Sequence, residues 1–289
     1  MKCTLLDVFA GQALNGNGLT IFSDCDHLDS AAMQAWTQEM RQFESLFISQ
    51  TADGFRARIF TMEEELDFAG HPLLGLAAWL HEQYGPARSD DKQEDEIQRW
   101  RVALNQQTVT LFSQRVAGHW LATMQQESPQ LLAQLTAAQA QIFYDALNLT
   151  APDNPNLSAD VITTGLPYLI LPVQGGLEQV QFRVADIGPL LAPFGASFLY
   201  VLDVDANEGR TWDNAGKVED IATGSAAGPA AAWLQAHLGL QDGKVTLKQG
   251  RFLNRPSEIR VELVMNGSHI EHLLVRGEVV KVADIALVS

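Results

Sequence analysis

The sequence predicts an α+β protein of two similar barrel-like halves related by a pseudo-twofold axis. Each half is expected to be a mostly antiparallel or mixed sheet wrapped around a central helix. The first observation behind this prediction is a repeat, because residues 65–80 and 219–234 align without a gap at a constant offset of 154. Glu, Gly, Ala, Ala, Trp and Leu coincide in the two copies. The second observation is that strand-like runs far outnumber helical ones, without the alternation typical of βαβ units.

The first half is predicted to span residues 1–124. Helices are expected at about 30–42, where Asp29 or Ser30 is a suitable N-cap, and at 71–83. The expected strands are 2–9, 19–22, 45–49, 55–61, 98–105, 107–113 and 118–124. The charged run 89–96 is expected to be a solvated turn.

The second half is predicted to span residues 125–289, and its last strand could return to the first half. Apolar residues at helical spacing predict a connecting helix over 129–147, and a linker follows at 150–156. A short helix is expected at 185–193, in addition to the repeated helix. The expected strands are 161–171, which a Gly-Leu-Pro sequence at 165–167 interrupts, 197–204, 244–249, 257–265, 269–275 and 278–282.

Composition excludes several classes of partner. The net charge of −16 disfavours binding to nucleic acid or to anionic membranes, which both require clustered Lys and Arg. The longest apolar stretch, 73–80, is too short to span a bilayer, and the N-terminus lacks the apolar region of a signal peptide. Cys3 and Cys25 form no disulfide framework. We therefore expect a cytoplasmic protein with neither a nucleic-acid nor a membrane partner.

Motifs for cofactors and metals are absent from the sequence. The glycine-rich segment 11–18 lacks the Lys-Ser or Lys-Thr of a phosphate-binding loop. Its Gly-x-Gly at 16–18 precedes a predicted strand, whereas the dinucleotide fingerprint requires a helix there. No spacing of His and Cys is typical of a zinc site. The sequence thus predicts no cofactor and no metal.

Glu44 is a candidate general acid/base because it lies between an amphipathic helix and the apolar run 46–48. A carboxylate against apolar neighbours favours its neutral form, which suits proton transfer near neutral pH. A solvated glutamate at a helix end is the alternative.

His71 and Ser225 hold equivalent places in the repeat, each directly after the glycine that begins a helix. Two such helix N-termini, if they face each other, can hold an anionic substrate. Ordinary helix capping is the alternative, and Asp220 could brace the turn before Ser225. Nothing identifies a base for Ser225, so a Ser-His-Asp triad is not predicted.

Together these segments resemble the PhzF-like family of phenazine biosynthesis, which shares the two-domain fold of diaminopimelate epimerase. The likeness covers nearly the whole chain. The segments that carry it are 7–9 with 16–17, 43–48, 58–61, 68–72, 219–226, 249–250 and 255–257. The Gly-His and Thr-Gly-Ser motifs, in this order and with a glutamate upstream, make the resemblance specific.

The resemblance implies cofactor-free isomerisation by proton transfer, as for trans-2,3-dihydro-3-hydroxyanthranilate in the known member. It implies that Glu44 shuttles the proton, accompanied by the polar residues His71, Asp220 and Ser225. Its implied substrate-binding residues are Asn17, Gly70 and Gly224. The substrate would be a small carboxylate, cyclic or conjugated, bound in a cleft between the halves of each subunit of a homodimer.

Two alternatives remain open: an amino-acid racemase or epimerase, and a non-catalytic small-molecule-binding module on the same fold. Epimerase relatives use two cysteines as acid and base, and no cysteine occupies the matching positions here.

Three departures from the family pattern bear on the substrate more than on the proton transfer. They are Gly18 and Ile221, each in place of proline, and Thr211-Trp212 in place of Arg followed by an apolar residue and Phe.

Overall fold

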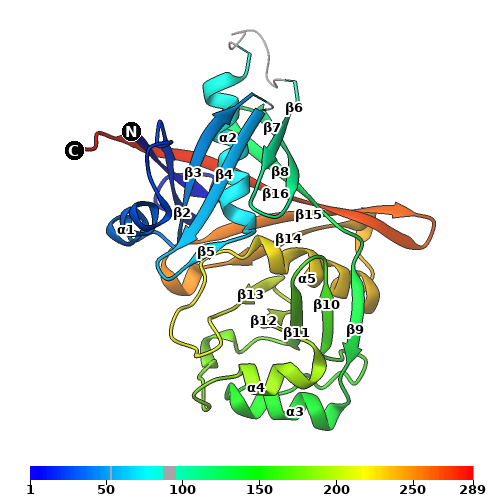
Figure 1. The fold of residues 1–289 in the computed structure, drawn as a ribbon. Coiled ribbons are helices and arrows are strands. Elements are labelled where there is room, and N and C mark those ends of the chain that lie inside the picture. The colour runs from blue at the N-terminus through cyan, green and yellow to red at the C-terminus, as the bar shows by residue number, and fades with distance from the viewer. Residues whose placement is uncertain (53, 87–95, 289) are drawn as a thin grey trace. The chain divides into compact units, whose positions relative to one another are not determined.

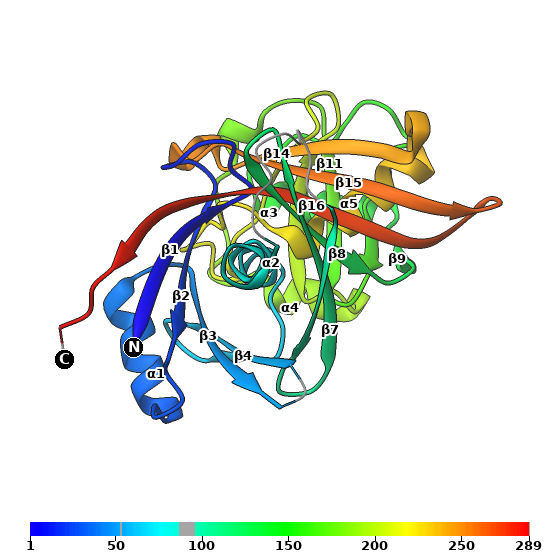
Figure 2. The same ribbon diagram turned by 90° about the horizontal axis from the view of Figure 1, so that it is seen from above.

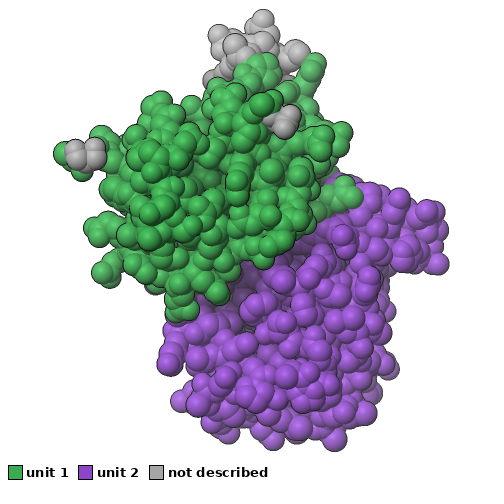
Figure 3. All heavy atoms as spheres, viewed as in Figure 1, with its two compact units in different colours: residues 1–125, 276–289 green, residues 126–275 purple. Residues whose placement is uncertain are grey.

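The computed structural model describes residues 1–52, 54–86 and 96–288, so residues 89–95 of the predicted solvated turn lie outside the described part. The chain divides into two compact units (Figure 3). Unit 1 comprises residues 1–125 and 276–289, and unit 2 comprises residues 126–275. Each unit is described on its own below.

Unit 1 contains a closed β-barrel with a mixed strand order. Its elements are β1 (Lys2–Val8), β2 (Asn17–Ser23), α1 (Ser30–Met40), β3 (Glu44–Thr51), β4 (Gly54–Thr61), β5 (Glu65–Leu66), α2 (Gly70–Tyr84), β6 (Gln98–Ala103), β7 (Thr108–Val116), β8 (His119–Gln126) and the end of β16 (His269–Ile285). The strands follow the order β1-β2-β3-β4-β6-β7-β8-β16, and the pairing of β1 with β16 closes the barrel. The pairs β2–β3 and β4–β6 are parallel, which makes the sheet mixed.

Helix α2 lies inside the barrel of unit 1. Figure 2 looks nearly along its axis, with the strands around it. All its residues from Gly70 to His81 are buried, as expected for a helix that is apolar on every side. A Cβ at Gly75 would lie 2.4 Å from the Leu19 side chain, so a glycine is required where α2 approaches β2. The repeated sequence therefore encodes a core helix.

Unit 2 is built on a second mixed sheet. Its elements are β9 (Gln130–Gln134), α3 (Ala137–Ala146), β10 (Asp160–Thr163), β11 (Pro167–Val173), the 3₁₀ helix η1 (Leu177–Gln179), α4 (Gly188–Leu191), η2 (Ala192–Phe194), β12 (Phe198–Asp203), β13 (Glu208–Arg210), α5 (Gly224–His237), η3 (Gln241–Gly243), β14 (Lys244–Gln249), η4 (Arg251–Leu253), β15 (Ser257–Asn266) and the start of β16. The order is β9-β10-β11-β12-β13-β14-β15-β16 (Figure 1).

The two faces of this sheet are covered by different helices. On β11, Leu169 and Leu171 join the apolar cluster formed with α3 and α4. Tyr168 alternates with them and contacts α5 on the other face, as the two-residue period of a strand requires. Helix α5 is buried along most of its length, and its Trp233 indole donates a hydrogen bond to the Ser158 carbonyl at 2.9 Å.

No helix in the described ranges has the length and apolarity needed to cross a bilayer.

The prediction of a single helix over 129–147 is wrong, because residues 130–134 form the edge strand β9. Helix α3 begins only after Thr136, whose side chain and that of Gln139 form a reciprocal capping box. Leu131 had suggested a helical face, but it is 61% exposed on the edge strand. The predicted strands 269–275 and 278–282 are one strand, β16. The mixed sheet and the barrel are confirmed, whereas the pseudo-twofold axis stays a prediction.

Candidate active site

Glu44 and His71 come together in unit 1. Glu44 is the first residue of β3, where it pairs with Leu19 on one side and Thr61 on the other. His71 is the second residue of α2. His71 Nδ1 lies 3.2 Å from Glu44 Oε2, and both side chains are more than 90% buried. The strand order and the central helix thus place a carboxyl group against an imidazole inside the fold.

Burial decides the charge of this imidazole. It lowers the pKa of His71 from 6.5 to about 3, and a hydrogen bond with the Gly18 backbone opposes this effect only in part. His71 is therefore neutral at neutral pH, with one ring nitrogen as donor and the other as acceptor. Because general acid/base transfer works over about 2.6–3.2 Å, the pair is spaced to hold or relay one proton.

The turn that leads into β2, whose first residue is Asn17, lies beside the same region of unit 1. Gly18 contacts His71 through its backbone, and a Cβ on Gly18 would lie 3.9 Å from Asp7 Oδ1. Asn17 is fully buried, and Asp7 accepts a hydrogen bond from the Leu14 N–H at 2.6 Å. Gly16 has a φ of +65°, and its Cβ would lie 2.3 Å from the Val8 carbonyl oxygen. Glycine is required there for both reasons.

In unit 2, Ser225 is the second residue of α5, and its Oγ lies 2.8 Å from the Tyr168 hydroxyl. Tyr168 is only 4% exposed. Sequence reasoning missed Tyr168 as a site residue, because a tyrosine in an apolar strand is typical of a core. The available signal was the break at 165–167 directly before it, because Tyr168 is the second residue of β11.

Asp220 is held in the turn that leads into α5. The Thr223 hydroxyl donates to Asp220 Oδ2. Gln249 Nε2 donates to the Asp220 carbonyl at 2.9 Å and to Thr223 Oγ1 at 3.0 Å. The buried Tyr200 hydroxyl donates to Gln249 Oε1 at 3.5 Å, and burial together with the charge of Asp220 raises the pKa of Tyr200. Asp220 is thus tied to the residue that precedes the helix.

Both glycine-opened helices begin without a side-chain cap. The N-cap residues Ala69 and Thr223 make no capping hydrogen bond to their helices with a side chain. The first N–H groups of an α-helix have no acceptor within the helix and carry its positive dipole end. The starts at Gly70 and Gly224 are therefore suited to a carboxylate, which supplies acceptors and negative charge.

The structure therefore brings Glu44 and His71 together in unit 1, and Asp220 and Ser225 to the start of α5 in unit 2. Their catalytic roles, and the substrate-binding roles of the other predicted residues, stay predictions. Within the part of the chain that the structure describes, no three His, Cys, Asp or Glu side chains form a metal-binding cluster.

The two cysteines are poorly suited to acid/base chemistry. Burial raises the pKa of Cys3 to about 12 and that of Cys25 to about 11. Both pack in an apolar cluster with Phe22, Phe47 and Phe60. A thiolate at either position is strongly disfavoured at neutral pH, so the pair does not supply a two-thiol proton relay.

The chain is similar to known proteins over nearly its full length. A family model described as phenazine biosynthesis-like protein, PhzC-PhzF, matches residues 6–284. The trans-2,3-dihydro-3-hydroxyanthranilate isomerase of Pseudomonas aeruginosa is 31% identical, over 96% of this chain and 95% of its own. A solved structure from the same organism, described as a predicted epimerase, is 45% identical with a TM-score of 0.88 and covers 100% of this chain and 99% of its own.

A second solved structure supports the fold alone. It is a PhzF-family phenazine biosynthesis protein from Bacillus anthracis, 20% identical with a TM-score of 0.81, and it covers 100% of this chain and 99% of its own. Several curated relatives are named isomerases, which defines the protein as an isomerase. The chain belongs to the PhzC-PhzF family.

Proposed function

We propose that the protein is a cofactor-independent isomerase that moves a proton between two carbons of a small, carboxylate-bearing, cyclic or conjugated substrate. The buried contact of Glu44 with the neutral imidazole of His71 carries the proposal, because a carboxyl group beside a neutral imidazole is suited to accept a proton and return it. The relative named trans-2,3-dihydro-3-hydroxyanthranilate isomerase supports this compound as the first substrate to test.

In the proposed reaction, Glu44 removes a proton from one substrate carbon and the electron pair moves through the conjugated system. A new C–H bond then forms at a second carbon with the proton that Glu44 returns. The substrate neither gains nor loses electrons, so the step requires no redox partner. We assign to His71 the task of orienting Glu44 and holding its proton between the two steps.

The remaining predicted residues receive binding roles in this proposal. We assign the stabilisation of negative charge on the substrate to the backbone N–H groups at the two helix starts, Gly70–His71 in unit 1 and Gly224–Ser225 in unit 2. Asp220, Ser225 and Asn17 would fix the orientation of the substrate. Backbone N–H groups can bind the carboxylate of many different molecules. These roles therefore define the class of substrate rather than one compound.

The proposal is tested by incubating trans-2,3-dihydro-3-hydroxyanthranilate with the enzyme in deuterated buffer. The native protein should convert it, and deuterium should enter the new C–H bond of the product to the extent that the proton on Glu44 exchanges with solvent before it is returned. Glu44→Gln should reduce turnover by about 10²–10⁴-fold, which is the usual contribution of a general acid/base. Glu39→Gln changes an exposed glutamate of α1 and should have no effect. Full exchange in Glu44→Gln would refute the assignment.

An amino-acid epimerase is a second candidate, favoured by the 45% identical relative described as a predicted epimerase. It would use the same carboxylate, and deuterium would enter Cα of an amino acid with inversion. Stabilisation by a metabolite without turnover would instead indicate a binding module.

We also propose that the protein is a cytoplasmic homodimer, and sedimentation can test the homodimer.

A further inference from the structure

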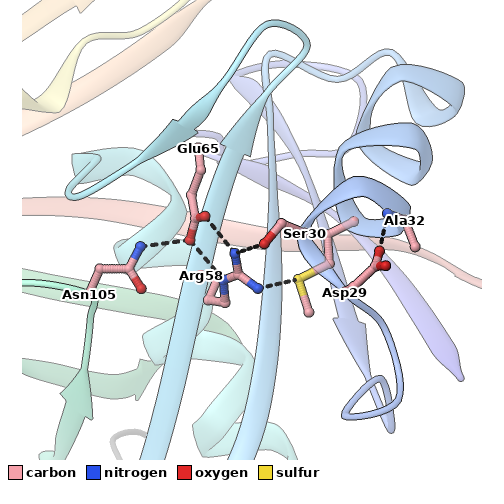
Figure 4. Close-up of polar contacts among 7 residues, drawn as sticks. Asp29, Ser30, Ala32, Arg58, Glu65 and Asn105 are labelled. Carbon is pink, nitrogen blue, oxygen red and sulfur yellow. Dashed lines mark hydrogen bonds and ion pairs between the residues drawn. The ribbon is translucent and has the colours of Figure 1, made fainter.

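An arginine–glutamate ion pair precedes each of the two glycine-opened helices. In unit 1, Arg58 Nε and Nη2 donate to the two carboxylate oxygens of Glu65 at 2.8 and 2.5 Å (Figure 4). In unit 2, Arg210 makes the same two contacts with Glu219 at 2.8 and 2.6 Å. Glu65 and Glu219 are the matched glutamates of the repeat, so both copies retain the ion pair.

The two pairs occupy the same place in the local structure. Glu65 lies in β5 opposite Phe60, in the strand that returns after β4. Glu219 lies opposite Trp212 in an isolated bridge that follows β13. Each glutamate stands five residues before the first residue of α2 or α5. Each pair therefore fixes the chain just before it enters the helix.

In unit 1, the pair also joins neighbouring elements. Arg58 Nη2 donates to Ser30 Oγ at 2.8 Å, and Asn105 Nδ2 donates to Glu65 Oε1 at 2.6 Å (Figure 4). Hydrogen bonding to Arg58 is the main cause that lowers the pKa of Glu65, so the carboxylate is charged at neutral pH. The side chains of the pair are only 21% and 24% exposed.

In unit 2, the pair is more deeply enclosed. Arg210 Nη1 donates to the Leu177 carbonyl at 2.6 Å. Its guanidinium carbon lies 4.6 Å from the centre of the Trp212 ring and 4.1 Å from that of Phe252. A bidentate arginine that is also stacked on aromatic rings has little freedom to move. The same ion pair is thus supported by different neighbours in the two units.

We propose that the two arginine–glutamate pairs are positioning residues for the helix starts: Arg58 with Glu65 holds the backbone at Gly70–His71, and Arg210 with Glu219 holds it at Gly224–Ser225. The N-cap side chains do not perform this task, since Ala69 and Thr223 provide no side-chain cap. A small displacement of N–H groups that hold a substrate lowers the reaction rate strongly. The catalytic consequence rests on the proposed function, whereas the effect on the backbone does not.

Amide hydrogen exchange of the full-length protein tests the backbone effect without any substrate. Arg58→Met keeps an unbranched apolar stem and removes the charged guanidinium, so exchange should accelerate at 66–73 but not at 220–226. Arg210→Met should give the reverse pattern. Lys281→Met is the control, because it breaks a pair with Glu82 near the other end of α2, and it should leave 66–73 unchanged. Unchanged exchange at 66–73 in a folded Arg58→Met variant would overturn the proposal.

A milder pair of variants covers the risk that Arg210→Met does not fold. Arg210→Lys keeps the charge but not the two parallel hydrogen bonds, and Glu219→Gln keeps the size of the carboxylate side chain. Each should accelerate exchange at 220–226 relative to the native protein. Native-like exchange there in both variants would overturn the proposal for unit 2.

Turnover of trans-2,3-dihydro-3-hydroxyanthranilate tests the catalytic consequence. Arg58→Met should lower kcat at least tenfold with a smaller change in KM, and Arg58→Lys should restore part of the loss. The double variant Arg58→Glu/Glu65→Arg should recover more activity than either single change. An equal loss in Arg58→Met and Lys281→Met would show a general stability effect and overturn the positioning role. Absence of turnover in the native protein would rule out this compound as the substrate, and the exchange experiment would then still decide the positioning role.

Discussion

Gln249 and Thr223 exchange two hydrogen bonds: the Thr223 N–H donates to Gln249 Oε1 at 3.2 Å, and Gln249 Nε2 donates to Thr223 Oγ1 at 3.0 Å. Gln249 ends strand β14, so the start of α5 is attached to the sheet. The next residue, Gly250, has a φ of +84°, and its Cβ would lie 2.7 Å from the Ile221 carbonyl oxygen. The turn before α5 therefore rests directly on the end of β14.

Replacement of Gln249 by leucine should destabilise unit 2. It leaves the Thr223 N–H and the Asp220 carbonyl without their buried partner, which costs about 1–3 kcal/mol per unsatisfied group. Urea unfolding should show this loss, and turnover should fall as well. Lys248→Leu changes the exposed neighbour in β14, and equal effects of the two changes would contradict the prediction.

Tyr168→Phe should affect activity more than stability. The change removes the hydroxyl that lies 2.8 Å from Ser225 Oγ, and a hydrogen bond of this kind contributes about 1 kcal/mol to stability. The Ser225 hydroxyl then loses a fixed orientation, so kcat should fall. Tyr84→Phe removes the hydroxyl of a tyrosine that is 49% exposed and serves as the control. A native kcat in Tyr168→Phe would show that this contact has no role in catalysis.

The buried His71 should make the protein less stable in acid. Its pKa is 6.5 in the unfolded chain and about 3 in the fold, so the unfolded state binds more protons between these values. The stabilisation is complete above pH 6.5 and is lost as the pH falls toward about 3, with a slope of at most about 1.4 kcal/mol per pH unit. Urea unfolding at pH 7, 5 and 4 should show a shallower decline for His71→Gln. Parallel curves for the two proteins would contradict this assignment.

Gly18 replaces a proline of the family pattern, and Gln42 occupies the space beside it. A Cβ at Gly18 would lie 2.1 Å from Gln42 Oε1, which is the far end of a flexible side chain. Gly18→Ala should therefore destabilise the protein by only about 1 kcal/mol or less, because the Gln42 side chain can turn away from the new methyl group. The double variant Gly18→Ala/Gln42→Ala should recover most of this loss. Additive losses in a double-mutant cycle would show that the two residues are not coupled.

The repeat was sufficient to predict the two core helices, because a run of small and apolar residues that follows a glycine is typical of a buried helix. The helices were predicted to begin near residues 71 and 224, and they begin at Gly70 and Gly224. Residues 129–147 were misassigned because Leu131 and Leu132 fit a helical period while lying exposed on an edge strand. Periodicity alone does not separate a short strand from the helix that follows it.

The contacts of the candidate site could be predicted only in part. The resemblance implied that Glu44 and His71 belong to the same active site. Their contact also requires that the start of β3 lies beside the start of α2, which is a property of the tertiary fold. Tyr168 and the Arg58–Glu65 pair were missed, since pairing across strands depends on register and on tertiary packing. The sequence offered no signal for the Arg58–Glu65 pair, and for Tyr168 it offered only the break directly before it.

Strand β16 has a consequence for the order in which the chain can fold. Unit 2 is one continuous stretch, whereas the barrel of unit 1 is closed by residues 279–285 pairing with 3–8. During synthesis, β1 can pair with β2 at once, but its second partner, β16, is completed only after unit 2 has been made. The C-terminal unit can complete its own sheet before the N-terminal barrel closes, so translation order and folding order are partly reversed. Loss of the last ten residues would accordingly damage the N-terminal unit first.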